Sequence, residues 1–271
     1  MLKDGHIHTP FCPHGTKDSF EEYIEKAIDL GFSEISFTEH APLPDGFEDT
    51  TPMKDSGMNS DYLNEYFRRV EDLKKSYQDR IRINLGLEVD YIEGYEKETM
   101  SFLNQHGEKL DDAILSVHFL KNGEYYDCLD YSPESFEQMI IKYGSLKNVY
   151  ENYYRTLLKS IHVDLGLYKP KRIGHITLVR KFHKKFPCEL EFRDEIFEIL
   201  YAIKDKGYEL DYNGAGTAKP LCREPYPPAW VAEKALHLNI PLIYGSDAHQ
   251  VKELMQGYDE LIINHSNKTN G

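Results

Sequence analysis

Histidines and carboxylates lie at the ends of successive apolar, strand-like runs in this 271-residue sequence. Imidazole nitrogens and carboxylate oxygens are ligands that zinc, manganese and iron accept in proteins. If the runs are parallel strands of one sheet, their carboxyl ends meet at the same edge and the donors converge. The sequence therefore predicts a metal site. The seven runs end near His8, His40, Glu88, His118, His175, Asn213 and His249.

The number of donors predicts more than one ion. A single histidine of this kind is most often a hydrogen-bonded packing residue, but such a set at matching strand ends is not explained by packing, because buried ionisable groups are costly unless paired. Catalytic zinc takes about three protein ligands and a water, so two or three ions are expected. The candidate ligands are His6, His8, His14, His40, Glu88, His118, His175, Asp247 and His249.

The spacing within the set is informative. Residues i and i+2 of a strand point to the same face, so His6 and His8 can bind one ion. Asp247 and His249 are also two apart, but they stand where a strand passes into a loop, which leaves open whether they face one ion or two. Cys12 lies near three of the histidines in sequence, and a thiolate ligand there is an alternative, although an isolated cysteine lacks the usual zinc-site spacing.

The elements that would position these donors alternate between strand and helix. Ser19 to Glu22 has the pattern of a capping box, and Asn122-Gly123 is typical of a hairpin turn. Strands are expected at 3–8, 34–38, 82–89, 113–119, 171–176, 208–212 and 242–245. Helices are expected at 19–30, 61–77, 96–106, 132–165 with a break near Gly144, 191–206, 227–238 and from 250 onward.

Seven strand–helix units predict an α/β fold built on one parallel sheet. Closed on itself, the sheet is a distorted (β/α)7 TIM-like barrel, and one domain spanning residues 1–271 is expected. In such barrels the chemistry lies at the carboxyl ends of the strands, where the donors are placed. The alternative is a doubly wound open sheet, but the sequence has no glycine-rich dinucleotide-binding turn to support it.

The charge, the apolar runs and the cysteines of the sequence limit the classes of partner and the cellular location that are expected. A formal charge of −14 argues against nucleic acid, which needs a basic surface. The apolar runs are too short to span a bilayer, and the first residues carry no apolar signal region, so a cytoplasmic location without membrane association is expected. The four cysteines form no CxxC pair, and no disulfide framework is expected.

The donor motifs resemble the PHP (polymerase and histidinol phosphatase) family of metal-dependent phosphoesterases. The similarity runs from residue 6 to residue 249 in family order, and no ligand of the family pattern is missing. The matching segments are His6-Ile-His8-Thr9, Cys12-Pro-His14, Thr38-Glu-His40, Gly86-Leu-Glu88, Ser116-Val-His118, Gly174-His175 and Ser246-Asp247-Ala-His249.

The resemblance implies three divalent transition-metal ions, zinc, manganese or iron. One ion is expected on His6, His8, Glu88 and Asp247, a second on Glu88, His118 and His175, and a third on His14, His40 and His249. The implied reaction is attack on phosphorus by a hydroxide that bridges two ions. Glu88, Asp247 and His249 are the expected catalytic residues, the last two or a metal-bound water as proton donor.

Arginine binds oxyanions as a rigid fork, and Arg180 and Arg223 follow the fifth and sixth strands, so they are expected to bind the substrate phosphate.

Chain length and the segments around His8, His175 and Glu224 resemble the stand-alone histidinol-phosphate phosphatases. The resemblance therefore implies a small phosphomonoester substrate, L-histidinol phosphate. The alternatives are a phosphoesterase for nucleotides or oligonucleotides, a protein phosphatase, and a metal-bound module without turnover. The oligomeric state is left open.

Overall fold

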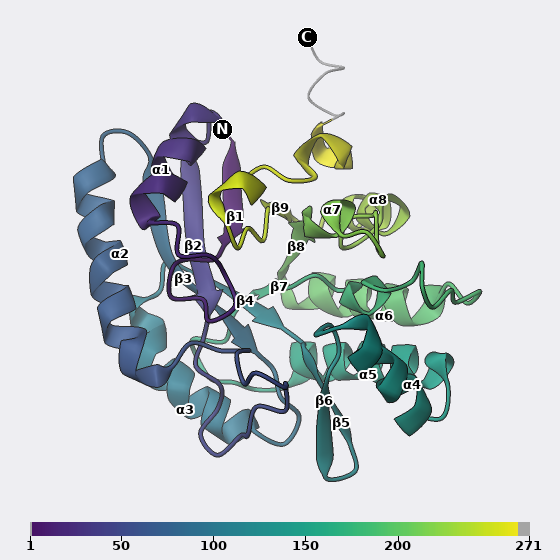
Figure 1. Cartoon of the computed structure of the whole chain (residues 1–271). Coiled ribbons are helices and arrows are strands. Elements are labelled where there is room, and N and C mark those ends of the chain that lie inside the picture. The colour runs from purple at the N-terminus through teal and green to yellow at the C-terminus, as the bar shows by residue number, and fades with distance from the viewer. Residues whose placement is uncertain (1, 265–271) are drawn as a thin grey trace.

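The computed structural model describes residues 2–264 and consists of one parallel sheet surrounded by helices (Figure 1). The sheet has seven strands in the order β1-β2-β3-β4-β7-β8-β9. Each pair of neighbouring strands in this order is parallel. The strands are β1 Lys3–Ile7, β2 Glu34–His40, β3 Arg82–Asp90, β4 Asp112–Ser116, β7 Arg172–Ile173, β8 Glu209–Asn213 and β9 Leu242–Gly245.

The two outer strands of this order meet and nearly close the sheet into a barrel. The amide of Asp247 donates to the carbonyl of His6 at 2.7 Å, and the amide of His8 donates to the carbonyl of Ala248 at 3.0 Å. A parallel bridge joins Ile7 to Ala248. The predicted α/β fold, a seven-stranded TIM-like barrel, is therefore confirmed.

Helices cover the outside of the barrel (Figure 1). Helix α1 begins with the predicted capping box, in which Ser19 and Glu22 bond to each other's backbone amides. Helices α4 and α5 form the segment predicted over 132–165, and the predicted break falls at Gly144, whose φ of +83° favours glycine. The helices are α1 Phe20–Asp29, α2 Leu63–Tyr77, α3 Glu96–His106, α4 Pro133–Lys142, α5 Leu146–His162, α6 Arg193–Lys206, α7 Ala215–Ala218 and α8 Ala229–His237.

A hairpin projects from the barrel after β4 (Figure 1). It pairs β5 Phe119–Asn122 with β6 Tyr125–Cys128, and Gly123 in its turn has φ of +62°. The hairpin turn was predicted. The strand predicted over 113–119 is wrong in its last residues, because the chain leaves the sheet after Ser116 and Phe119 already belongs to the hairpin.

Two further expectations are corrected. The strand predicted over 171–176 pairs only at Arg172 and Ile173. The segment from 250 onward is not a long helix within the described residues but three short 3-10 turns. The 3-10 turns of the chain are η1 Ser60–Tyr62, η2 Gly107–Lys109, η3 Leu178–Arg180, η4 Val251–Glu253, η5 Tyr258–Glu260 and η6 Ile262–Asn264, and residues 265–271 lie outside the described part.

Apolar side chains fill the space between the sheet and the helices. Phe37, Leu85 and Leu115 are buried on three neighbouring strands, and Tyr153 and Leu157 of α5 are buried against the same core. Among residues 2–264, no helix has the length and apolarity that a membrane span needs.

Candidate metal centre

Strand register brings the predicted donors together at the carboxyl end of the barrel. His40 on β2 pairs directly with Glu88 on β3, and His40 Nδ1 lies 3.2 Å from Glu88 Oε2. Because neighbouring parallel strands end at the same edge, their register places the end of β2 beside the end of β3. His6 on β1 reaches the same carboxylate, with Nε2 3.3 Å from Oε2.

Glu88 lies at the middle of the cluster and is almost completely buried. Its Oε1 accepts a hydrogen bond from Ser116 Oγ at 2.6 Å. His175 Nε2 lies 3.0 Å and His118 Nε2 3.8 Å from the same oxygen. Oε1 faces these two imidazoles and Oε2 faces those of β1 and β2, so one carboxylate has two sides that can each serve a different cation.

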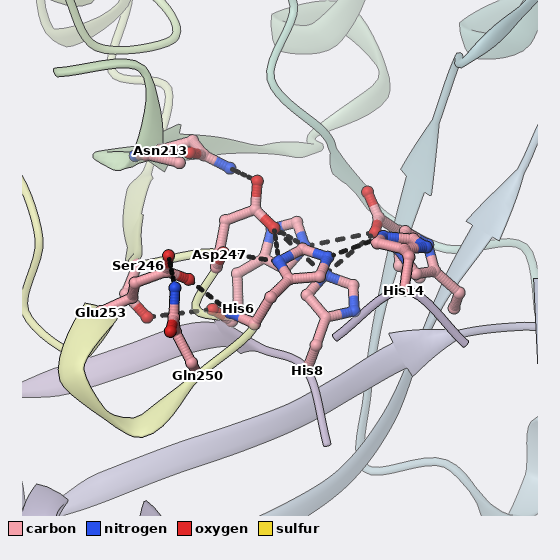
Figure 2. Close-up of polar contacts among 12 residues, drawn as sticks. His6, His8, His14, Asn213, Ser246, Asp247, Gln250 and Glu253 are labelled. Carbon is pink, nitrogen blue, oxygen red and sulfur yellow. Dashed lines mark hydrogen bonds and ion pairs between the residues drawn. The ribbon is translucent and has the colours of Figure 1, made fainter. Parts of the chain in front are cut away.

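Asp247 approaches from the loop after β9 (Figure 2). Its φ of +53° is in the left-handed region, which aspartate tolerates better than most residues. Oδ1 lies 3.1 Å from His8 Nε2 and 3.7 Å from His6 Nε2, and Oδ2 accepts a hydrogen bond from Asn213 at 3.2 Å. The sharp turn therefore aims the carboxylate into the barrel instead of along the strand.

Most of the histidines use Nδ1 for an oxygen acceptor and leave Nε2 for the centre. The acceptors assign the proton to Nδ1 in these rings, so Nε2 carries the lone pair that a cation binds. The pairs are His6 with Asp211 Oδ2 at 3.0 Å, His8 with Glu39 Oε1 at 3.2 Å, His14 with Asp55 O at 2.7 Å, His118 with Asp90 Oδ1 at 2.8 Å and His249 with Asp247 O at 3.0 Å.

The histidine nitrogens of the cluster are arranged as ligands of bound cations would be. His14 Nε2 and His249 Nε2 lie 3.1 Å apart, and with both protons on Nδ1 two lone pairs face each other. Buried nitrogens without a hydrogen-bond partner include His6 Nε2 and both ring nitrogens of His40. Buried polar atoms normally have partners, and facing lone pairs repel unless a positive charge lies between them. The donor set therefore suits imidazole- and carboxylate-binding transition metals.

The pKa values of the clustered histidines and carboxylates also indicate a site that favours positive charge. Burial lowers the pKa of His8, but Asp247 and Glu39 outweigh it and raise the pKa to about 9. Burial is likewise outweighed at His118, where Asp90 raises the pKa to about 10. Burial opposes ionisation of Glu88, yet His6 and His175 hold its pKa well below the usual value. The carboxylates thus stay charged. Without a metal ion, protons on His8 and His118 supply the positive charge beside them, and a bound cation would take the place of the protons on Nε2.

Donor atoms of the cluster gather in three neighbouring groups, within each of which they lie no more than 4.8 Å apart, and a fourth such group, His183, Cys222 and Glu224, contains none of the predicted ligands. The first two groups contain ligands of the first two predicted ions. Glu88 belongs to the second group, and its carboxylate also lies near His6 and His8 of the first. The third contains His40 and His249 of the third predicted ion, and His14 Nε2 adjoins it. The groups are His6, His8 and Asp247; Glu88, His118 and His175; and His8, Cys12, His40 and His249.

A cavity of about 400 Å³ opens over the cluster. Most of the predicted ligands line it, whereas His6 and His8 are fully buried and do not. Two lysines, Lys181 and Lys219, add positive charge to its wall. A space of this size accepts a small molecule.

Arg180 and Arg223 lie outside the lining of this cavity. Arg180 forms an ion pair through Nε with Glu224 Oε1, and Arg223 Nη1 donates to Thr217 O at 3.4 Å. Their binding of phosphate stays a prediction. Lys181 Nζ instead faces the cavity, and it donates to Asp130 Oδ2 at 2.8 Å and to Asp130 O at 2.7 Å.

Sequence reasoning missed the side chains that orient the imidazoles. Glu39 and Asp211 are fully buried, and Asp90 is nearly so. Their sequence signal is present but weak: Glu39 adjoins His40, Asp90 follows Glu88 by two residues, and Asp211 and Asn213 share one face of β8. The sixth strand therefore supplies orienting groups in place of a ligand, which explains why its end carries only an amide.

We expect Glu39→Gln to weaken metal binding about 10–100-fold, because an outer carboxylate fixes the orientation and basicity of its histidine. Glu39 Oε1 faces His8 Nδ1, and Oε2 accepts from the Thr9 amide at 2.8 Å. Competitive titration of the apo protein with zinc and a chromophoric chelator measures the affinity. Glu34→Gln, on the same strand at the opposite end of the barrel, is the matched control. Equal affinities for the two variants would contradict this role for Glu39.

A parallel barrel with buried imidazoles and carboxylates at its carboxyl end is the arrangement expected of a metal-dependent hydrolase. The model of the PHP domain matches residues 4–215. The chain is 47% identical to the histidinol-phosphatase of Bacillus subtilis over 96% of this chain and 98% of that protein. The chain therefore belongs to the PHP domain family, and the family resemblance seen in the sequence is confirmed.

Solved structures agree with this assignment. A Listeria monocytogenes protein provisionally described as a histidinol phosphatase superimposes with a TM-score of 0.91 and 41% identity, covering 95% of this chain and 99% of that one. The histidinol phosphate phosphatase of Lactococcus lactis, solved with zinc, L-histidinol and phosphate, has the same fold with a TM-score of 0.67 and 21% identity, covering 92% of this chain and 87% of that one.

Proposed function

We propose that this chain is a phosphomonoesterase that hydrolyses L-histidinol phosphate to L-histidinol and phosphate, a step of histidine biosynthesis. The observation that carries the proposal is the 47% identity to a histidinol-phosphatase over nearly the whole of both chains. The donor cluster supports it, because the ligand pattern expected of a metal-dependent phosphoesterase is complete. The cavity of about 400 Å³ is suited to a small substrate.

Three divalent transition-metal ions are part of the proposal, held as the sequence resemblance implied. Support comes from the three groups of donor atoms and from the two-sided position of Glu88. Bound ions would supply positive charge for the phosphoryl oxygens and a nucleophile at neutral pH. Zinc is the first choice because imidazole and carboxylate ligands suit it. A cytoplasmic location stays a prediction from the sequence.

The residues of the chain then have defined tasks. The imidazoles and carboxylates at the strand ends hold positive charge beneath the cavity, where developing negative charge is stabilised. Asp247, 20% exposed at its side chain, and His249, 24% exposed, are open to the cavity from the loop after β9. They are therefore placed to move a proton to the leaving alkoxide, whereas Glu88, which also lines the cavity, is only 2% exposed at its side chain.

The experiment that tests the substrate is phosphate release by the zinc-loaded protein. L-histidinol phosphate is compared with phosphoserine, a nucleoside monophosphate and a short oligonucleotide at equal concentrations. We expect kcat/KM for L-histidinol phosphate to exceed the others by about 100-fold or more, which corresponds to about 3 kcal/mol of differential transition-state binding. A preference for the nucleoside monophosphate or the oligonucleotide would overturn the substrate assignment and favour the alternative nucleotide phosphoesterase.

Lys181 provides a second prediction. Two of its three N–H donors bind Asp130 among the described residues, which leaves one for a phosphate in the cavity. We expect Lys181→Met to lower kcat/KM about 10–100-fold while the metal content stays the same, since a charge-assisted hydrogen bond is lost. Lys185→Met, whose ammonium lies outside the cavity near Glu134, is the control.

The arginine prediction is tested in the same assay. Arg180→Ala and Arg223→Ala should each reduce kcat/KM with metals retained if these guanidinium groups bind the phosphate. Full activity in both variants, together with a loss in Lys181→Met, would assign phosphate binding to the cavity lysine instead.

A further inference from the structure

Cys12 is buried beside the third group of donors. It is fully inaccessible, and its Sγ lies within 4.8 Å of ligand nitrogens of His8, His40 and His249. These atoms come from the β1–α1 loop, from β2 and from the loop after β9, so three segments distant in sequence converge on the sulfur. The ligand set implied by the family resemblance does not include this sulfur, and the sequence alone leaves a thiolate ligand there open.

The loop that carries Cys12 is held firmly against the site. The Cys12 amide donates to Thr9 O at 2.9 Å, and Thr16 donates through its amide to His249 O at 3.0 Å. Gly15 lies between them, and a Cβ at that position would lie 3.3 Å from Cys12 Sγ and 3.2 Å from His249 O. The missing side chain lets the loop pack closely on His249 and fixes the sulfur where it is.

An independent observation indicates a ligand at this place. His40 is 7% exposed, and neither of its ring nitrogens forms a hydrogen bond, although Nδ1 lies 3.2 Å from Glu88 Oε2. His14 Nε2 and His249 Nε2 face each other at 3.1 Å in the immediate surroundings. Unpartnered buried nitrogens and facing lone pairs are costly, and a cation bound among them removes both costs.

We propose that Cys12 is a thiolate ligand of the ion held by His40 and His249, and that it makes this position selective for zinc over manganese. The thiol proton passes to solvent as the sulfur–metal bond forms. Soft thiolate ligands favour zinc, whereas manganese favours oxygen ligands. Zinc–sulfur and zinc–nitrogen bonds of about 2.3 and 2.1 Å require ligand atoms within about 4 Å of one another, a modest contraction of the observed group.

This proposal rests on the metal dependence proposed above, but its test is independent of activity. The full chain is stripped of metal and reloaded with cobalt, whose thiolate complexes show a sulfur-to-cobalt charge-transfer band in the near ultraviolet. We expect the band in the unaltered protein and in Cys128→Ser, whose cysteine also lines the cavity, and its loss in Cys12→Ser. Absence of the band at full cobalt loading, or its survival in Cys12→Ser, would overturn the proposal.

Metal competition tests the selectivity. With equal zinc and manganese in the loading buffer, we expect the zinc-to-manganese ratio in Cys12→Ser to fall about tenfold relative to the unaltered protein and to Cys128→Ser. An unchanged ratio would refute the selectivity.

If Cys12→Ser does not fold, X-ray absorption at the zinc edge of the unaltered protein decides instead: a sulfur neighbour supports the ligand, and a shell of nitrogen and oxygen alone contradicts it. Failure of phosphate release with a cobalt–thiolate band present would reject the proposed function and leave the Cys12 ligand standing.

Discussion

Glu88→Gln is expected to lower kcat/KM by about 1,000-fold or more and to remove at least one metal ion per chain. The substitution keeps the size of the side chain but removes the charge that faces His6 and His40 on one side and His175 on the other. A loss of about 4 kcal/mol in transition-state stabilisation corresponds to this factor. Elemental analysis of the purified variant, together with phosphate release, measures both effects.

The matched control is Glu209→Gln, at the first position of β8 and therefore at the opposite end of the barrel. It should keep its metal and its activity. Circular dichroism should show both variants folded, since Ser116 can donate to an amide oxygen as it does to the Glu88 carboxylate. A Glu88→Gln protein with full metal content and activity within tenfold of the unaltered chain would show that Glu88 does not hold the ions.

Removal of the metal by a chelator is expected to abolish phosphate release and to lower the midpoint of thermal unfolding by about 10 °C. Ligands that bind only the folded state stabilise it by about 4 kcal/mol at 1,000 times their dissociation constant. For a chain of this length each kcal/mol moves the midpoint by about 2–4 °C. The physical cause is local: without cations, Glu88 and Asp247 stay close together and the imidazole lone pairs face each other.

Thermal scans before and after dialysis against the chelator, and again after zinc is restored, measure the change. Both the activity and the midpoint should return with zinc. The Glu88→Gln protein is the informative comparison, because chelation should shift its midpoint by less. An unaltered midpoint and retained activity after complete metal removal would show that the buried nitrogens of His40 do not depend on a cation for their stability.

The sequence predicted the barrel and the convergence of donors because both follow from strand periodicity. His6 and His8 share a face by spacing alone, and His40 meets Glu88 because β2 and β3 pair in register. Strand ends were predicted less well. The strand around Arg172 is only two residues long. After it, Gly174 lies so close to β4 that a Cβ there would come within 2.1 Å of Ser116 Oγ.

The orienting groups could not be predicted, because they depend on contacts between distant segments. Glu39 meets a histidine 31 positions away, and Asp211 meets His6 across 205 positions. No local pattern records such pairs. The cavity wall was no more predictable: Lys181 and Arg180 are adjacent in sequence, but Lys181 lines the cavity and Arg180 pairs with Glu224.

His14 and His249 lie on the two sides of the seam where β1 and β9 close the barrel. These residues are 235 positions apart, and β1 and β9 meet through only a few backbone bonds, including those at His8 and Asp247. Joining chain ends this distant costs about 5 kcal/mol of loop-closure entropy, which the proposed ion, if shared by the two imidazoles, would offset. With the proposed ion in place, metal loading and closure of this seam would be coupled, and we expect amide hydrogen exchange at His8 and Asp247 to slow when zinc is added.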